Sequence, residues 1–393
     1  MADKKTNKID VPLLVVTVLL VGFGILMVYS ASSYSAQINY GNKYYYMFKQ
    51  MIGALLGFMA MFALTFIDYH FLRKIRYIIL AVSYVLLVLV FIPGVGVENY
   101  GARRWINLPF FTLQASEISK FAFIIFTASY MAKNHEKMTK FTGLLPILAV
   151  GLSTCVLIIA EPNMSITICT GLLMFAMMFV GGARIKHFII IAVPLVIAVV
   201  VLILIEPYRL SRLMAFLDPW KSPLGEGFQL IQSLYSLGSG GFFGLGLFNS
   251  RQKYLFLPFS ESDFIFSIIG EELGLFGCLV VMGAYVFLIY RAIKIAQQST
   301  DRFGCYLASG IAAIIAIQVL VNIAVVTGSI PPTGLPLPFI SAGSSSLIVF
   351  CASIGILQSV ARHSHRSVEA LGIKQERLPA AEKPIKKNHK AKI

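Results

Sequence analysis

Long apolar runs separated by short polar stretches extend along most of this chain. Ten of them are long enough, or nearly so, to cross the roughly 30 Å hydrocarbon core of a bilayer as helices. They lie at about 12–30, 52–67, 77–93, 116–132, 143–160, 165–181, 188–205, 263–290, 306–327 and 345–361. The pattern predicts an all-α integral membrane protein with ten transmembrane helices. One long loop, 206–262, separates the seventh helix from the eighth.

The composition supports a membrane protein. With 57% hydrophobic and 13% charged residues among 393, and a mean hydropathy of +0.78, the chain cannot bury its apolar surface in one water-soluble core. We expect one membrane domain, 12–361, after a short N-terminal tail, 1–11. The basic tail, 362–393, is predicted to be disordered and attracted to anionic lipid; binding to a cytoplasmic protein is the alternative.

The basic residues predict the orientation. If the helices alternate sides, most of the 33 lysines and arginines fall on the side of the two termini. Lysine and arginine accumulate in short cytoplasmic loops, so both termini are predicted to be cytoplasmic and the 206–262 loop extracellular. Topology thus accounts for the net charge of +15. Since no aromatic residues interleave the basic tail, we expect no nucleic-acid partner.

The cysteines do not indicate a metal or disulfide framework. All five, at 155, 169, 278, 305 and 351, lie in or beside apolar runs. The sequence contains no CxxC motif and no Cys/His cluster with the spacing of a zinc site. We therefore predict no structural metal.

Asp263 is the first candidate for chemistry because it ends the polar 206–262 stretch and opens an apolar run. An acid beside hydrocarbon is costly and usually functional, with a partner nearby. The alternative is a solvated helix-start acid that complements the helix dipole. Candidate cationic partners within the preceding loop are Arg209, Arg212, Lys221, Arg251 and Lys253.

A second polar segment, 93–120, contains Arg103, Arg104 and Trp105. Arginine offers planar, permanently charged forks for phosphate oxygens. Tryptophan can carry a sugar ring or anchor the helix at the membrane interface. Glu117 and Lys120, three residues apart on one helical face, can neutralise each other, and that pair can be purely structural.

Two loops have unusual backbone requirements. The glycine-rich run 238–246 follows no strand, so a nucleotide-binding reading fails; close backbone packing or a re-entrant turn fits better. The run 331–338 holds four prolines, which exclude a helix. Irregular backbone at membrane depth is tolerated when buried or lining a cavity, so we expect it to form a wall of the outward-facing site; an inert connecting loop is the alternative.

Several of these segments occur together and in order in one known family. The motifs are Gly101-Ala-Arg-Arg-Trp-Ile, Gln114-Ala-Ser-Glu, Ser262-Asp-Phe-Ile-Phe and the run from Asn322 to Ser345. Over about residues 10–365 the chain resembles the SEDS family of bacterial cell-wall synthesis proteins. Ser250-Arg-Gln-Lys and Asp218-Pro-Trp look more like its FtsW and SpoVE branch than like RodA.

The resemblance implies a peptidoglycan glycosyltransferase that polymerises lipid II, a disaccharide pentapeptide on undecaprenyl pyrophosphate, on the outer face of the bacterial cytoplasmic membrane. Septal wall synthesis in cell division is the expected role. Asp263 matches the family's essential acid and would deprotonate the acceptor hydroxyl. The candidate substrate-binding residues are Arg103, Arg104, Trp105, Glu117, Lys120, Arg212, Arg251 and Lys253.

The resemblance also implies partners, namely lipid II, a class B penicillin-binding protein, other divisome proteins and membrane lipids. No cofactor is required by the pattern, although a divalent cation, Mg or Mn, could assist the pyrophosphate. Two further functions stay open. A lipid II flippase would use the intramembrane polar groups as a path, and a non-catalytic scaffold for a transpeptidase would not need the Asp263 carboxylate.

The chain departs from the family pattern at several positions. The family usually has a Pro-Glu pair two residues earlier, where this chain has Glu261 in Pro258-Phe-Ser-Glu. Glu161-Pro-Asn163 stands where Gln-Pro-Asp is common, so a carboxylate has moved by two positions. Ala115 and Ser344 replace a proline and a glycine, changes that affect local backbone more than chemistry. Glu271 and Glu272 are expected to be buried structural or lining groups.

Overall fold

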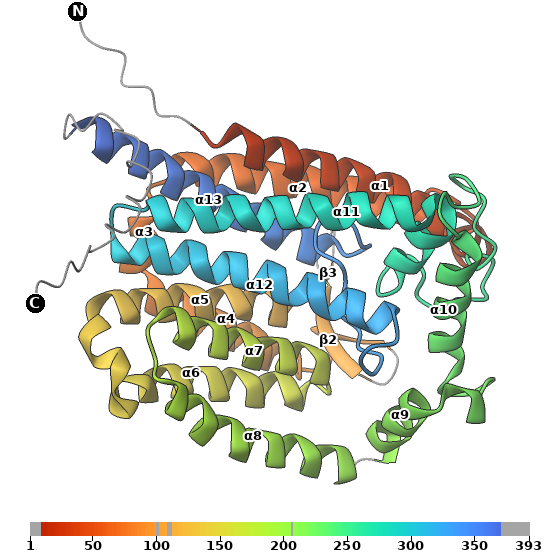
Figure 1. Ribbon diagram of the computed structural model, residues 1–393, viewed down its shortest axis with the longest axis horizontal. Helices are drawn as coiled ribbons and strands as arrows, with labels where there is room; N and C mark the ends of the chain where they lie inside the picture. The colour runs from red at the N-terminus through yellow and green to blue at the C-terminus, as the bar shows by residue number, and fades with distance from the viewer. Residues whose placement is uncertain (1–8, 100–101, 108–111, 206, 371–393) are drawn as a thin grey trace, which may run out of the picture.

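The computed structural model describes residues 9–99, 102–107, 112–205 and 207–370, and shows a bundle of long helices (Figure 1). Every predicted apolar run overlaps one helix. These helices are α1 (Val11–Tyr40), α2 (Tyr45–Phe66), α4 (Arg76–Leu89), α5 (Ala115–Lys133), α6 (Phe141–Ala160), α7 (Met164–Val180), α8 (Ile185–Ile205), α11 (Ile265–Gln298), α12 (Arg302–Val326) and α13 (Ser344–Ala370).

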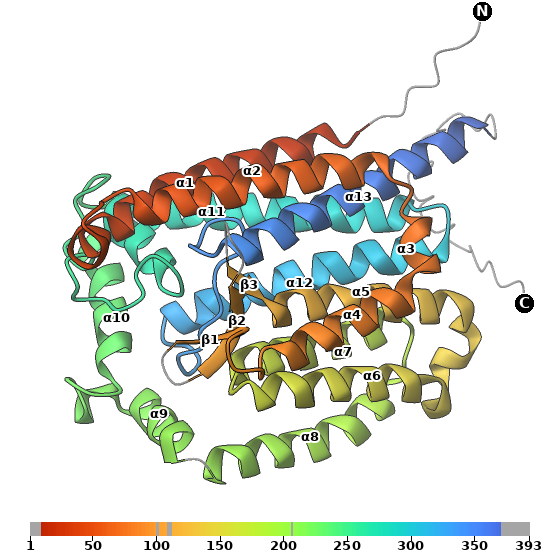
Figure 2. The ribbon, with the colours of Figure 1, turned by 180° about the vertical axis from the view of Figure 1, so that it is seen from behind.

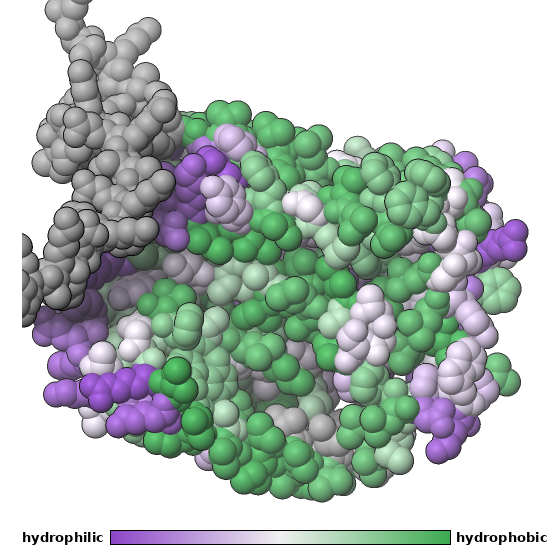
Figure 3. All heavy atoms as spheres, in the orientation of Figure 1, coloured by the Kyte–Doolittle hydropathy of each residue, from purple (hydrophilic) through white to green (hydrophobic). Residues whose placement is uncertain are grey.

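The membrane character is confirmed in its coarse form. Within the described residues, six helices are long and apolar enough to cross a membrane by length and composition: α1, α2, α6, α11, α12 and the 344–364 part of α13. Helices α4 and α7 are shorter, with 14 and 17 residues. The count of ten spans therefore stays a prediction. Apolar side chains cover much of the face shown in Figure 3, with hydrophilic residues gathered towards its two ends.

The helices pack in an order that brings distant parts of the chain together. Helix α13 packs along α2, and α12 packs against α5, α7 and α11. The first residues of α1 and the last of α13 lie at one end of the bundle (Figures 1 and 2). Helices α9 and α10 lie at the other end. We call it the site end because α11 begins there, shortly after Asp263.

The 206–262 loop contains helices of its own. They are α9 (Pro207–Leu217), the short 3-10 helix η2 (Pro219–Lys221) and α10 (Phe228–Gly240). Two further short elements, α3 (His70–Lys74) and the 3-10 helix η1 (His135–Thr139), join longer helices. Helix α13 continues nine positions beyond the predicted end of the last apolar run, and residues 371–393 of the basic tail lie outside the described residues.

One segment forms β-strands, contrary to the all-α expectation. Strands β1 (Gly96–Asn99), β2 (Ala102–Asn107) and β3 (Thr112–Gln114) form an antiparallel sheet in the order β1-β2-β3. Trp105 pairs with Gln114 and with Val97. A Cβ on Gly96 would lie 1.9 Å from the carbonyl oxygen of Val90, so only glycine lets the chain turn back this closely after α4.

Helix α11 is interrupted at Gly274, whose φ of 68° and ψ of −167° are not helical. The glycine-rich run supplies hydrogen bonds there: Leu245 N donates to the Glu271 carbonyl at 2.9 Å, and Leu275 N donates to the Gly241 carbonyl at 2.9 Å. A Cβ on Gly240 would lie 1.9 Å from the Gly270 oxygen. The close backbone packing predicted for the 238–246 run is confirmed.

The proline-rich segment between α12 and α13 is irregular, as predicted. It is nevertheless buried, since Leu335, Leu337 and Ile340 are at most 1% exposed. A Cβ on Gly24 of α1 would lie 2.6 Å from the Phe339 carbonyl oxygen. The segment therefore belongs to the interior of the bundle rather than to a connecting loop outside it.

Candidate active site

Asp263 lies at the junction predicted from the sequence, between a turn at 259–262 and the first residue of α11. Its backbone is fixed by Asn322 of α12, whose side-chain amide donates to the Asp263 carbonyl oxygen at 2.9 Å and to the Leu335 carbonyl oxygen at 2.8 Å. Asn322 is 1% exposed. A buried amide that bridges two backbone carbonyls holds their segments in a fixed relation.

The proline-rich segment closes against the same turn. Ser341 Oγ donates to the Ser262 carbonyl oxygen, and Ala342 N donates to the Glu261 carbonyl oxygen at 2.8 Å. A Cβ on Gly334 would lie 3.2 Å from Oδ2 of Asp263. The proline-rich segment thus lies beside the Asp263 carboxylate, and its role as a wall of the site stays a prediction.

The surroundings of Asp263 favour its neutral form more than water does. Burial raises the pKa of Asp263 to about 7, and the charge of Glu261 acts in the same direction. The charge of Arg212, a hydrogen bond from Ser262 and the charge of Arg104 oppose the shift. A carboxyl group poised near neutrality can exchange a proton with a substrate at physiological pH.

Arg104 joins the sheet to the turn between α6 and α7. Its side chain donates to the carbonyl oxygens of Glu161, at 3.3 Å, and of Pro162. The Glu161 side chain is fully buried, and neither carboxylate oxygen has a hydrogen-bond partner among the described residues. Burial raises the pKa of Glu161 to about 8, against the opposing charge of Arg104.

The turn that contains Glu161 also reaches the proline-rich segment. Ser165, in the first turn of α7, accepts a hydrogen bond from Gly334 N at 3.2 Å. Asn163 caps α7 by accepting from Ile166 N at 3.3 Å. Arg104 therefore contacts the backbone of Glu161 and acts electrostatically on Asp263, and Gly334 contacts both Ser165 and Asp263.

Glu117 and Lys120 form the predicted pair inside the bundle. Lys120 Nζ lies 2.8 Å from Glu117 Oε1 and 3.0 Å from Gln318 Oε1, and both charged side chains are 0% exposed. Ser346 Oγ donates to Glu117 Oε2 at 3.3 Å, and Gln318 donates to the Pro336 carbonyl oxygen at 3.0 Å. The mutual neutralisation is confirmed, whereas contact with substrate stays a prediction.

Lys253 lies in a different network. Its ammonium group contacts Glu272 Oε1 at 3.1 Å and the Phe248 carbonyl oxygen at 2.6 Å, and its side chain is 5% exposed. Glu271 accepts from Arg251 N at 2.9 Å and from Gln252 N at 3.3 Å. The two glutamates are buried structural groups, as predicted, and they hold the 248–253 loop against α11.

The other predicted residues are distributed over the site end. Arg103 and Trp105 are half-buried on β2, and Arg251 is exposed. Arg212 of α9 lies 3.7 Å from Glu226, in addition to its electrostatic effect on Asp263. The structure thus associates Arg104 and Arg212 with Asp263, while the binding roles of all these residues stay predictions.

The sequence reading did not assign functions to Asn322, Gly334 or Ser165. Asn322 carried a signal, because an amide inside an apolar run needs a buried partner. Gly334 lies in the run expected to form the wall, but neither Gly334 nor Ser165 carried a signal of its own, since their contacts join segments far apart in the sequence, 169 residues apart for the hydrogen bond between them. The described residues contain no group of three or more His, Cys, Asp or Glu side chains that could hold a metal ion.

The fold and the site together define a polytopic helical membrane protein with a partly buried carboxylate, Asp263, at one end of its bundle. Residues 11–366 match the family described as the FtsW, RodA and SpoVE cell cycle proteins. The chain belongs to this family, which confirms the resemblance to SEDS proteins seen in its motifs.

Relatives of the chain cover nearly its whole length. It is 41% identical over 369 residues to stage V sporulation protein E of Bacillus subtilis, covering 93% of this chain and 100% of that protein. It is 42% identical over 355 residues to a probable peptidoglycan glycosyltransferase FtsW of Trichlorobacter lovleyi, covering 89% of this chain and 92% of that protein.

Solved structures share the fold. One, described as "Structural coordination of polymerization and crosslinking by a peptidoglycan synthase complex", contains a chain that matches with a TM-score of 0.75 and 28% identity, covering 91% of this chain and 98% of that one. The rod shape determining protein RodA of Thermus thermophilus matches with a TM-score of 0.66 and 25% identity, covering 90% and 97%.

Proposed function

We propose that this protein is a peptidoglycan glycosyltransferase that polymerises lipid II into glycan strands. The observation that carries the proposal is Asp263, whose backbone carbonyl accepts a hydrogen bond from Asn322, whose carboxyl lies beside Gly334, and whose pKa responds to the charges of Arg104 and Arg212. Family membership and the FtsW relatives supply the substrate class.

In the proposed reaction the Asp263 carboxylate removes the proton from the 4-hydroxyl of the acceptor sugar. The hydroxyl oxygen bonds to the anomeric carbon of the donor as the bond to the pyrophosphate oxygen breaks. The undecaprenyl pyrophosphate leaves with the bonding electrons, and the direct displacement inverts the anomeric configuration. A base with a pKa of about 7 suits this proton transfer.

The departing pyrophosphate needs positive charge nearby. Arg104 and Arg212 are the best placed, because both act electrostatically on Asp263. Arg103 and the exposed Arg251 lie at the same end of the bundle, and Trp105, Glu117 and Lys120 would border the substrate cavity. Lys253 is assigned a structural role instead, because Glu272 and the Phe248 carbonyl oxygen already occupy its ammonium group.

A divalent cation, Mg or Mn, that accompanies the pyrophosphate is a separate proposal. Because the described residues offer no ready metal-ligand cluster, we derive no step through a metal. Polymerisation assays with a chelator, followed by re-addition of Mg²⁺ or Mn²⁺, test the requirement directly.

We further propose that the site end faces outward, with both termini in the cytoplasm of a bacterial cell. A class B penicillin-binding protein, acting with other divisome proteins, is the proposed partner. The structural match to a chain of a peptidoglycan synthase complex supports this pairing.

Septal synthesis is the proposed role, supported by the FtsW relatives. Depletion of the protein should give filamentous cells, whereas a block confined to spore formation would assign the chain to sporulation.

The experiment that tests the function uses purified protein in detergent with lipid II and a blocked transpeptidase partner. Glycan strands resolved by gel are the expected product. Failure to make strands, combined with transfer of lipid II across reconstituted vesicles, would replace the polymerase with a flippase. If the partner alone makes normal glycan strands and needs this chain only to be recruited, the chain is a non-catalytic scaffold.

A further inference from the structure

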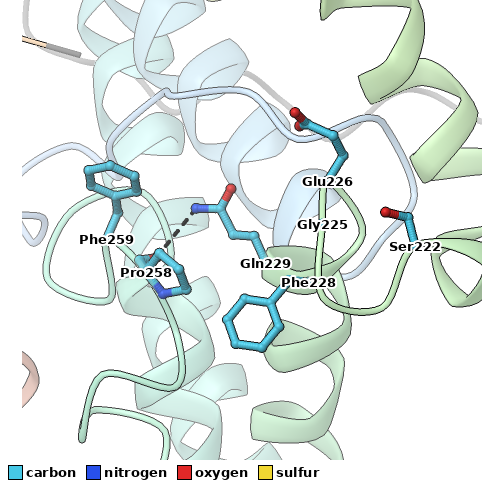
Figure 4. Close-up of a pocket in the computed structure, with 7 residues that line it drawn as sticks. All are labelled: Ser222, Gly225, Glu226, Phe228, Gln229, Pro258 and Phe259. Carbon is cyan, nitrogen blue, oxygen red and sulfur yellow. Dashed lines mark hydrogen bonds between the residues drawn. The ribbon is translucent and has the colours of Figure 1, made fainter.

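A pocket opens beside the turn that leads to Asp263. It has a volume of about 410 Å³ and is lined by Ser222, Gly225, Glu226, Phe228, Gln229, Pro258 and Phe259. Figure 4 shows Pro258 and Phe259 on one side, Ser222 and Glu226 on the other, and Gln229 between them. The volume lies within the range of roughly 300–1,000 Å³ that is usual for small-molecule sites.

The pocket and Asp263 share one turn. Gln229 of α10 donates to the Pro258 carbonyl oxygen at 3.3 Å, which joins the two walls. The Phe259 carbonyl oxygen accepts from Ser262 N at 3.1 Å and from Phe264 N at 3.3 Å. The residues on either side of Asp263 are therefore held by the backbone of a residue whose side chain lines the pocket.

Phe259 has an unusual conformation. Its φ of 56° is in the left-handed region, which a bulky side chain rarely adopts and only at a cost. Burial of the ring does not offset this cost, since Phe259 is 40% exposed. Phe248 and Phe339 have a similar positive φ, so the backbone conformation does not by itself mark a ligand site. The partly exposed ring of Phe259 nevertheless lines the pocket and presents an aromatic surface to a ligand.

The charges of the pocket are balanced. Its one acidic residue, Glu226, lies 3.7 Å from Arg212. The remaining lining consists of two phenyl rings, a proline ring, an amide, a hydroxyl and the backbone of Gly225. Such a surface suits a neutral ligand with an apolar face and a polar rim, because aromatic rings cover the face while the amide and hydroxyl exchange hydrogen bonds with the rim.

A pyranose ring has this character, with C–H groups on its faces and hydroxyl or acetamido groups around its edge. We propose that the pocket is a sugar subsite, which holds one neutral N-acetylhexosamine ring of the glycan next to the Asp263 turn. The assignment rests on the proposed glycosyltransferase function and adds a place where the sugar, rather than the pyrophosphate or the lipid, is recognised.

Binding can be measured without turnover. The probe is a soluble tetramer of β-1,4-linked N-acetylglucosamine, and saturation-transfer NMR reports its contact with the purified full-length protein. Wild type and Asp263→Asn should both give signal on the acetamido and ring protons. Phe259→Gly removes the ring and accommodates the positive φ, so its affinity should fall roughly three- to tenfold, as expected for a lost aromatic contact.

Phe256→Ala is the matched control. Phe256 is on the same loop and is 56% exposed, but it does not line the pocket. We expect the tetramer to bind this variant as it binds wild type. Gln229→Leu is a second test of the pocket, and thermal unfolding of each variant shows whether it is folded.

Polymerisation kinetics give the second readout. Phe259→Gly should raise the KM for lipid II by a similar factor and change kcat less. Asp263→Asn should instead abolish turnover. Equal tetramer binding and equal KM in folded Phe259→Gly and wild type would overturn the sugar subsite. A second result would also overturn it: wild type binds a free stem pentapeptide but not the tetramer, and Phe259→Gly abolishes the binding of the pentapeptide. If wild type makes no polymer, the proposed function fails, while tetramer binding still decides the subsite.

Discussion

Gly334 lies directly against the carboxylate of Asp263. A Cβ at position 334 would be 3.2 Å from Oδ2, closer than side-chain contacts normally allow. The two residues come from different segments, which Asn322 joins through hydrogen bonds to the carbonyl oxygens of Asp263 and Leu335. A side chain at position 334 would therefore crowd the Asp263 carboxylate.

Gly334→Ala should reduce polymerisation while leaving the protein folded. The added methyl must push the carboxylate or the segment by a few tenths of an ångström, and misplacement of a reacting group by about 1 Å can cost on the order of a hundredfold in rate. We expect a loss of at least about tenfold in kcat. Gly343→Ala is the control, since its Cβ would meet the nearest atom at an ordinary 3.7 Å. Equal rates in the two variants would argue against a crowded carboxylate.

The rate should depend on pH through Asp263. The base must be ionised, and burial raises its pKa to about 7, so kcat/KM should fall about tenfold per unit well below neutrality and level off above it. Arg212→Gln removes a charge that lowers this pKa, which should move the acid limb to higher pH. Lys221→Gln, an exposed change on the same loop, should not move it. A shift to lower pH in Arg212→Gln would contradict the assignment.

Lys253→Met should destabilise the protein strongly. It leaves Glu272 buried and without its ion-pair partner, a change that typically costs about 3–5 kcal/mol. The double variant Lys253→Met/Glu272→Gln should regain much of the loss, as measured by thermal unfolding in detergent, with a KM for lipid II close to that of wild type. A stable double variant with a much higher KM would instead support the pyrophosphate contact predicted from the sequence.

Glu161 should make stability depend on pH. Its pKa is raised from 4.5 to about 8 in the folded protein, so the folded state holds a proton that the unfolded state releases. Relative to Glu161→Gln, wild type should lose stability as pH rises from about 4.5 to about 8, by up to about 1.4 kcal/mol per unit, and no further above that range. The difference in unfolding temperature between the two proteins measures this. A constant difference across the range would exclude a buried neutral acid.

Hydropathy predicted the helices well because the apolar runs are long and few other structures suit them in lipid. It did not detect the break in α11, since Gly274 lies inside a continuous apolar run and interrupts the helix only because the 241–246 backbone packs there. The β2 strand was missed for a similar reason. Its six residues, which include two arginines and a tryptophan, give a weak local pattern, and the strand is stabilised by pairing with β1 and β3.

Asp263 was predictable because an acid at the start of an apolar run needs an explanation. Its neighbours were only partly predictable. Arg104 and Arg212 were candidates, but so was Lys253, whose partner Glu272 is 19 residues away and faces it only in the folded protein. Long-range contacts, such as Asn322 with Asp263, decide which of several charged residues belong to one site.

The most direct test of the account compares wild type with Asp263→Asn at equal folded amounts, using purified protein, lipid II and a blocked transpeptidase. The substitution keeps the shape of the side chain and removes the base. The account predicts that the variant binds lipid II as wild type does and makes no glycan strands. Strand synthesis by the variant at a rate near that of wild type would contradict it.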